Sequence, residues 1–247
     1  MAIKGKGRTR SGRRVITAPP RPQLVVRKPP IWRRRSVLIG LGVVAAVAIT
    51  VVVLTTLHRS HERAFKNREV AAVDTLSRQL ASKLPANAQA VQPDLFVFYP
   101  SLNQDLDALA GGKLNTTKAA TEAGQIRASA VAAQQGIQAI SIAHFIPNDF
   151  TVSAVPSIKA KGLTQKQLID AQFLMGKAFQ LYQNVADLMK AAATAGGAQR
   201  TAFTTQAKSI FSQAGEIFDR GFRTVLDIRQ ALGITGSFPT PSSSAGA

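Results

Sequence analysis

Few side chains in this sequence have the type and spacing that metal binding or catalysis needs. His58, His61 and Glu62 stand at positions i, i+3 and i+4, so a helix would turn all three toward one side. Imidazole and carboxylate groups placed in this way can contribute ligands to a metal site. The sequence offers no further ligand beside them, and we predict neither a metal site nor a cofactor.

Groups for nucleophilic or acid–base catalysis are equally scarce. Asp105 and Asp107 are two residues apart, so on a helix they face different directions. The sequence has no G-x-S-x-G motif, and its GKGR stretch near the N-terminus lacks the strand-to-helix context of a phosphate-binding loop. The NTT sequence at 115–117 matches a glycosylation sequon, and we interpret it as a helix cap. We therefore predict no catalytic residues and no enzymatic activity.

The clearest feature of the sequence is an apolar segment at residues 36–57, SVLIGLGVVAAVAITVVVLTTL, without charge or proline. As a helix it would span roughly 33 Å, about the thickness of the hydrocarbon core of a bilayer. We predict a transmembrane helix. A cleaved signal peptide is the alternative, but it would have a shorter basic region, a shorter apolar core and a small-residue cleavage site. The following LTTLHRSHER has no Ala-x-Ala pattern, so we favour an uncleaved signal anchor.

The charges on either side of the apolar segment predict its orientation. Residues 1–35 carry 12 Lys and Arg and no acidic residue, whereas the other flank mixes basic residues with Glu62 and Glu69. The more basic flank of a span stays in the cytoplasm. We therefore predict a plasma-membrane protein with a cytoplasmic N-terminus and an extracytoplasmic C-terminal domain. We assign this topological role, together with contacts to lipid headgroups, to Arg33, Arg34 and Arg35.

Most of the net charge lies in this tail. The whole chain has a formal charge of +18, of which residues 1–35 contribute +12. The tail is rich in proline and poor in aromatic residues, so we predict that residues 1–35 are disordered, as are residues 239–247. Such a charge would suit nonspecific binding to nucleic acid. Because the tail lies next to the apolar segment, we favour anionic lipid over nucleic acid as its partner.

Residues 58–238 are predicted to form a helical domain. Apolar residues recur at a spacing of three and four in four segments, at residues 58–84, 115–143, 164–195 and 198–232. No comparable strand pattern appears, and short connections favour antiparallel neighbours. We predict an all-α fold, in which a single transmembrane helix is followed by an extracytoplasmic domain resembling a four-helix bundle. The chain has no cysteine, so its apolar core must stabilise this domain without disulfides.

Local motifs predict where several helices begin and end. Ser/Thr-x-x-Gln patterns at 101–104 and 164–167 predict capping boxes, the first of them opening a short helix. Gly233 predicts a left-handed C-terminal cap on the last helix.

Two connections hold more apolar residues than a turn requires. They are LFVFYP at 95–100 and the long segment at 145–162. Long ordered loops are often functional. Two interpretations remain open, since the connections either cover the ends of the helices or expose a surface to a partner. In the second case, the contact residues are Phe96, Phe98, Tyr99, Phe150 and Val152.

Small residues recur within the apolar segment, at Gly42, Ala46 and Thr50. A stripe of small side chains at four-residue spacing lets two transmembrane helices approach closely. It favours a homodimer through this helix, although small residues are common in any span rich in alanine and valine.

The opening MAIKGKGRTRSGRR, the KPPIWRRR before the apolar segment and the alanine-rich remainder resemble uncharacterised single-pass membrane proteins of actinobacteria. These proteins have a basic N-terminal tail and an exported helical domain. The resemblance covers chiefly the first 57 residues. It implies a bacterial plasma membrane facing the cell wall, and it carries no activity.

Three classes of function are compatible with these features. The first is a membrane-anchored protein of the cell envelope whose exported helical domain binds a partner protein in a non-catalytic role. The alternative is a ligand-sensing domain that relays to another membrane protein, because the cytoplasmic tail holds no output module. An envelope hydrolase is the third class, and no motif supports it.

Overall fold

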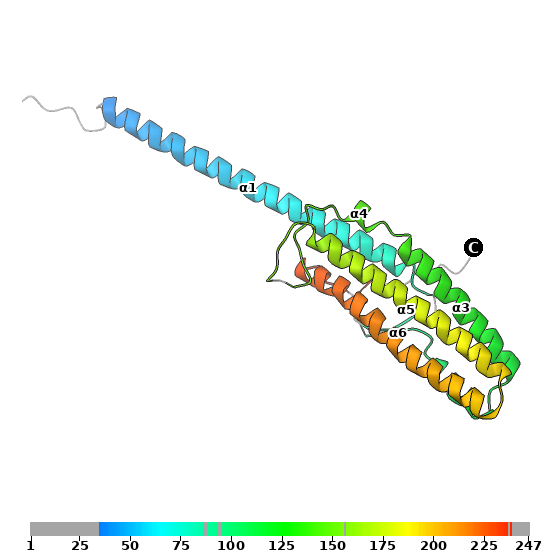
Figure 1. Cartoon of the computed structure of the whole chain (residues 1–247). Coiled ribbons are helices and arrows are strands. Elements are labelled where there is room, and N and C mark those ends of the chain that lie inside the picture. Colours follow the sequence, from blue (N-terminus) through cyan, green and yellow to red (C-terminus); the bar gives the residue numbers. More distant parts are fainter. Residues whose placement is uncertain (1–34, 86–87, 93–94, 156, 237, 239–247) are drawn as a thin grey trace, which may run out of the picture. The chain divides into compact units, whose positions relative to one another are not determined.

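The computed structural model describes residues 35–85, 88–92, 95–155, 157–236 and 238. The chain divides into two compact units, residues 1–57 and 58–247. In chain order the elements are α1 (Arg35–Ala81), β1 (Gln89–Gln92), β2 (Leu95–Val97), α2 (Leu102–Ala110), α3 (Thr116–Gln138), α4 (Ile142–Phe145), α5 (Leu163–Thr194) and α6 (Gly197–Ala231) (Figure 1). Most of the described residues are therefore helical, as the sequence predicts.

The first unit holds the N-terminal part of α1, which contains the apolar segment. Among the described residues, this is the one helix long and apolar enough to cross a membrane, and its most apolar stretch is not buried inside the protein. Val44 is 69% exposed and Leu54 is 61% exposed. The hydroxyl of Thr50 donates to the carbonyl of Ala46 at 2.8 Å. The polar group of this threonine is thus satisfied within its own helix, as apolar surroundings require.

The predicted tails fall largely beyond the described residues. Arg33 and Arg34 lie outside them, as do residues 239–247, and Arg35 is the first residue of α1.

Helix α5 is central to the second unit, because it packs along both α3 and α6 (Figure 1). The part of α1 within this unit adds buried Val73, Leu76 and Leu80 to the core. The buried positions of α5 recur every three or four residues, which confirms the predicted stripe. They include Leu168, Ala171, Met175, Ala178, Tyr182, Val185 and Met189.

Helices α5 and α6 lie close together where Gly221 faces Ala171. A Cβ atom added to Gly221 would lie 2.8 Å from the carbonyl oxygen of Ala171 and 3.1 Å from the Cβ of Leu174. Because Gly221 has no side chain, the backbones of the two helices can pack this closely.

Two helix ends follow their local sequence. At the start of α3, the side chain of Asn115 accepts hydrogen bonds from two backbone N–H groups of the first turn, at 2.8 and 3.3 Å. At the end of α6, Gly233 has a φ of +72° and the N–H of Ile234 donates to the carbonyl of Arg229. This is the hydrogen-bond pattern of a left-handed C-terminal cap, and it confirms the prediction.

The second predicted helix is shorter than its apolar pattern indicates. Helix α3 ends at Gln138, and α4 follows as a separate turn. The side-chain amide of Gln172, from α5, donates to the carbonyls of Ile137 and Ile140 at 2.6 and 2.7 Å. The end of a helix leaves carbonyls without partners, and here a side chain from a neighbouring helix satisfies them. A tertiary contact therefore supports the break.

Neither predicted capping box forms. The side chain of Ser101 makes no capping hydrogen bond at the start of α2. The hydroxyl of Thr164 donates to the carbonyl of Val152, and the Oε1 atom of Gln167 accepts from the N–H of Ala154 at 3.1 Å. The sequence predicts that the two side chains of the second motif cap α5. They instead attach the preceding connection to this helix.

Within the described residues, strands β1 and β2 form a short antiparallel hairpin. Gln89 pairs with Val97 and Ala90 with Phe96 in an antiparallel register, with an irregularity beyond Ala90. No strand pattern in the sequence indicates this hairpin. Strands of four and three residues are too short to show a repeating pattern.

Candidate functional site

Four of the five residues predicted for a partner surface are buried in the core. The exposed fraction is 5% for Phe96, 2% for Phe98, 5% for Tyr99 and 0% for Phe150. Val152 is half-buried and packs against the same core. An exposed partner surface at these residues is therefore wrong. The other interpretation, in which the connections cover the ends of the helices, accounts for the burial of these residues. Covering the helices removes large aromatic surfaces from water.

Phe98 is the centre of an aromatic cluster that joins the first connection to α5 and α6. Its ring centroid lies 5.2 Å from that of Phe179, 4.6 Å from that of Phe218 and 5.8 Å from that of Tyr182. The first two pairs meet edge to face, an arrangement that aromatic rings favour. Phe96, Phe98 and Tyr99 of this connection are thus part of the core.

Phe150 fastens the second connection to α1. Its ring meets that of Phe65 edge to face at 5.9 Å. The Cζ atom of Arg68 lies 5.4 Å from the centroid of Phe150, and its guanidinium forms an ion pair with Asp149. Apolar and charged contacts together hold this connection against the helix.

Glu69 adds a buried polar contact to the same junction. Its Oε1 atom accepts a hydrogen bond from the N–H of Thr151 at 3.2 Å. Burial raises the pKa of Glu69 above its ordinary value of 4.5, while this hydrogen bond and the charge of Arg68 act in the opposite direction.

A cleft of about 580 Å³ opens between the start of α2 and residues 122–129 of α3. Its volume falls within the range of about 300–1,000 Å³ that is usual for small-molecule sites. The lining residues are Tyr99, Pro100, Ser101, Leu102, Asp105, Glu122, Gln125, Ile126 and Ser129. This cleft is the best candidate for a ligand site among the described residues.

Tyr99 forms one wall of the cleft in a strained conformation. Its φ is +53°, a left-handed value that costs a bulky residue about 1–3 kcal/mol. Its hydroxyl donates to the carbonyl of Ile126 at 3.3 Å. Burial raises the pKa of Tyr99 to about 12.

The acidic side chains of the cleft come from two helices, Asp105 from α2 and Glu122 from α3. The Oε1 atom of Glu122 lies 3.6 Å from the ammonium nitrogen of Lys118. Its Oε2 atom is buried without a hydrogen-bond partner among the described residues. Two carboxylates in one cleft favour a cationic ligand. The sequence did not indicate Glu122, because nothing in its local pattern distinguishes it from an ordinary surface residue.

The histidine cluster of α1 is exposed. The Nε2 atom of His58 lies 3.1 Å from the Oε1 atom of Glu62, and both side chains are largely in solvent. In the part of the chain that the structure describes, no group of three or more His, Cys, Asp or Glu residues is placed to hold a metal ion.

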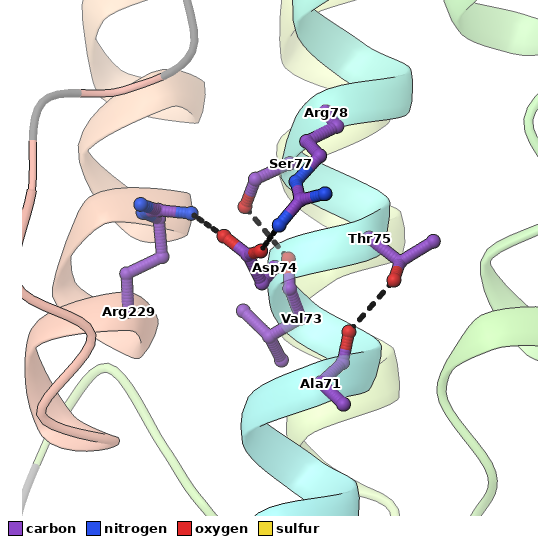
Figure 2. A network of polar contacts seen from close by, with 7 residues as sticks. All are labelled: Ala71, Val73, Asp74, Thr75, Ser77, Arg78 and Arg229. Carbon is purple, nitrogen blue, oxygen red and sulfur yellow. Dashed lines mark hydrogen bonds and ion pairs between the residues drawn. The ribbon is translucent and has the colours of Figure 1, made fainter.

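A second polar cluster joins α1 to α6. Asp74 accepts from Arg78 one turn later on α1, and its Oδ1 atom lies 3.2 Å from the Nη1 atom of Arg229 on α6 (Figure 2). Arg229 is only 5% exposed, and its Cζ atom lies 5.7 Å from the ring centroid of Phe238. A guanidinium so deeply buried needs its carboxylate partner, so we assign this cluster to stability.

Replacing Asp74 with asparagine should therefore destabilise the protein by about 3 kcal/mol, because it leaves Arg229 buried without a counter-charge. The matched control is Asp187→Asn, which removes the carboxylate from an ion pair with Arg127 in which both side chains are 55% exposed. The control should cost less than about 1 kcal/mol. Urea unfolding of both variants measures the difference, and equal losses would contradict the buried role of Asp74.

The small-residue stripe of the apolar segment lies on an open surface. Gly42, Ala46 and Thr50 are all exposed on α1, and a Cβ atom added to Gly42 would meet nothing within 4 Å. A homodimer through this stripe stays a prediction.

A scan of protein-family models and searches of curated proteins and of solved structures find no match to this chain. The function is accordingly inferred from the residues themselves.

Proposed function

We propose that the chain is a single-pass membrane protein of the cell envelope whose exported domain, a four-helix bundle, binds a partner protein without catalysis. The observation that carries the proposal is the exposed apolar stretch of α1, none of which is buried inside the protein. Exposing so many large aliphatic side chains to water is unfavourable, and a bilayer removes that cost.

The basic tail supports an orientation with the N-terminus in the cytoplasm. Its 12 Lys and Arg precede the apolar stretch without a compensating acid. Arg33, Arg34 and Arg35 would then bind anionic headgroups at the inner surface, each contributing about 1 kcal/mol.

The four-helix interpretation of the exported domain rests on which helices bury apolar residues. Helices α3, α5 and α6 each present a buried stripe, and α1 after residue 58 adds a fourth. Together they would enclose one core, with the two connections covering its ends.

Phe173 supports a partner-binding role. It is 67% exposed on α5, and Ile169, one turn earlier, is 45% exposed. Apolar side chains spaced by one turn on a helix are typical anchors of protein contacts. This pair replaces the buried aromatic residues as the proposed partner surface.

In-cell photo-crosslinking tests this role directly. A photoreactive residue at Phe173 should give a discrete adduct of the full-length protein, whereas the same residue at exposed Lys190, near the other end of α5, should not. Protease added to intact cells should digest the domain after residue 57. A protected domain would contradict the topology, and equal or absent adducts at the two positions would contradict the partner surface.

Ligand sensing is a second candidate function, favoured by the cleft at Tyr99. The buried, unpartnered oxygen of Glu122 and the nearby Asp105 favour a small organic cation. Binding would stabilise the folded domain, since only the folded state holds the cleft.

A thermal-shift titration of the full-length protein with putrescine and arginine tests this candidate. At least one of them should raise Tm, and Glu122→Gln should abolish the rise. Glu216→Gln, on the exposed side of α6, is the control and should keep it. No rise with either amine, or an equal rise in both variants, would contradict a cationic ligand at this cleft.

A further inference from the structure

We propose that residues 155 and 157–161 contact the surface of the membrane in which the chain is anchored. Their apolar side chains enter the interface, and their lysines bind anionic lipid headgroups. The inference rests on the proposed membrane anchoring and adds a second contact between the chain and the lipid. We call the described residues of this stretch, 155 and 157–161, the surface turn.

The surface turn exposes apolar side chains where a water-facing loop would carry polar ones. Val155 is 46% exposed and Ile158 is 51% exposed. The N–H of Ile158 donates to the carbonyl of Val155 at 3.0 Å, so one turn presents both residues. Outside α1, the only other large apolar side chains so exposed among the described residues are Ile169 and Phe173.

The charges of the surface turn are complementary to anionic lipid. Lys159 and Lys161 are exposed and follow Ile158 directly in the chain, and Lys166 lies at the start of α5. No acidic residue occurs between Asp149 and Asp170, and Asp149 is engaged by Arg68. Apolar side chains interleaved with lysines are the composition of segments that lie in a membrane interface.

Two hydrogen bonds join the residues before the surface turn to the first residues of α5. Val152 and Ala154, just before the surface turn, bind the side chains of Thr164 and Gln167 through their backbone. The exposed apolar residues therefore lie in a segment whose two flanks are attached to each other.

The chain limits how far the surface turn can lie from the apolar segment. Phe65 is eight residues after Leu57, the end of the apolar segment, which limits their separation to about 29 Å even when fully extended. Phe150 contacts Phe65 at 5.9 Å, and Val155 follows Phe150 by five residues.

Because the chain has no cysteine, single-site labelling of the full-length protein tests the proposal. An environment-sensitive fluorophore on Ser157→Cys keeps Val155 and Ile158 in place. The labelled protein is reconstituted in vesicles of phosphatidylcholine with or without phosphatidylglycerol. Quenching by lipids spin-labelled near the headgroup is then compared with that of Gln199→Cys, at the start of α6, and of Val52→Cys, within the apolar segment.

We expect the Ser157 label to be quenched at least about twofold more strongly than the Gln199 label, and more so with phosphatidylglycerol. Val155→Ser combined with Ile158→Ser should remove the quenching. Lys159→Gln combined with Lys161→Gln should remove its dependence on phosphatidylglycerol.

The outcomes separate this inference from the anchoring. If the Val52 label is quenched by spin labels deep in the bilayer while Ser157 behaves like Gln199, the surface contact is overturned and the anchor stands. If the Val52 label is not quenched, the anchoring itself fails. Equal quenching at Ser157 with and without phosphatidylglycerol would overturn the role of the lysines.

Discussion

Replacing Phe98 with alanine is expected to lower the free energy of unfolding by about 3–5 kcal/mol. Phe98 is 2% exposed, and its ring meets those of Phe179 and Phe218 edge to face. The truncation loses both the buried aromatic surface and these ring contacts, and it leaves a cavity among rigid neighbours. Equilibrium unfolding in urea, followed by circular dichroism of the full-length protein in detergent, measures the loss.

Phe173→Ala is the matched control, since it removes the same atoms from a side chain that is 67% exposed. Its effect on stability should stay within about 0.5 kcal/mol. A similar loss in both variants would contradict the burial of Phe98. A loss confined to Phe98 would confirm that its ring belongs to the core.

Replacing Gly221 with alanine is expected to destabilise the protein by about 1–3 kcal/mol. The added Cβ would lie 2.8 Å from the carbonyl oxygen of Ala171, which is backbone and cannot rotate away. Helices α5 and α6 would have to move apart along their contact. This cost outweighs the gain in helix propensity of about 1 kcal/mol that alanine normally brings over glycine.

The control for Gly221 is the same substitution at Gly124, inside α3. A Cβ atom at Gly124 would meet nothing within 4 Å, so only the gain in propensity remains. Gly124→Ala should raise the free energy of unfolding by about 0.5–1 kcal/mol. The two substitutions should therefore have opposite signs in thermal and urea unfolding, and a stabilising Gly221→Ala would show that the helices do not pack as described.

The sequence by itself determined the features that depend on local pattern. The apolar segment, the buried stripes of α3 and α5, the cap at Asn115 and the left-handed end at Gly233 all appear where the sequence predicts them. The reason is that helical periodicity and terminal capping are decided by residues within a few positions of one another.

Only the tertiary structure decided the roles of side chains whose partners are remote in sequence. Thr164 and Gln167 have the spacing of a capping box, but they bind the backbone of a connection that folds back over α5. Gln172 satisfies the end of α3, and Phe98 is buried by rings from α5 and α6. The type of a residue does not reveal whether its side chain faces water or another helix. Only the packing of the folded domain decides how exposed that side chain is. The Tyr99 cleft, with the unpartnered oxygen of Glu122, arises for the same reason, because its walls come from segments that meet only in the folded domain.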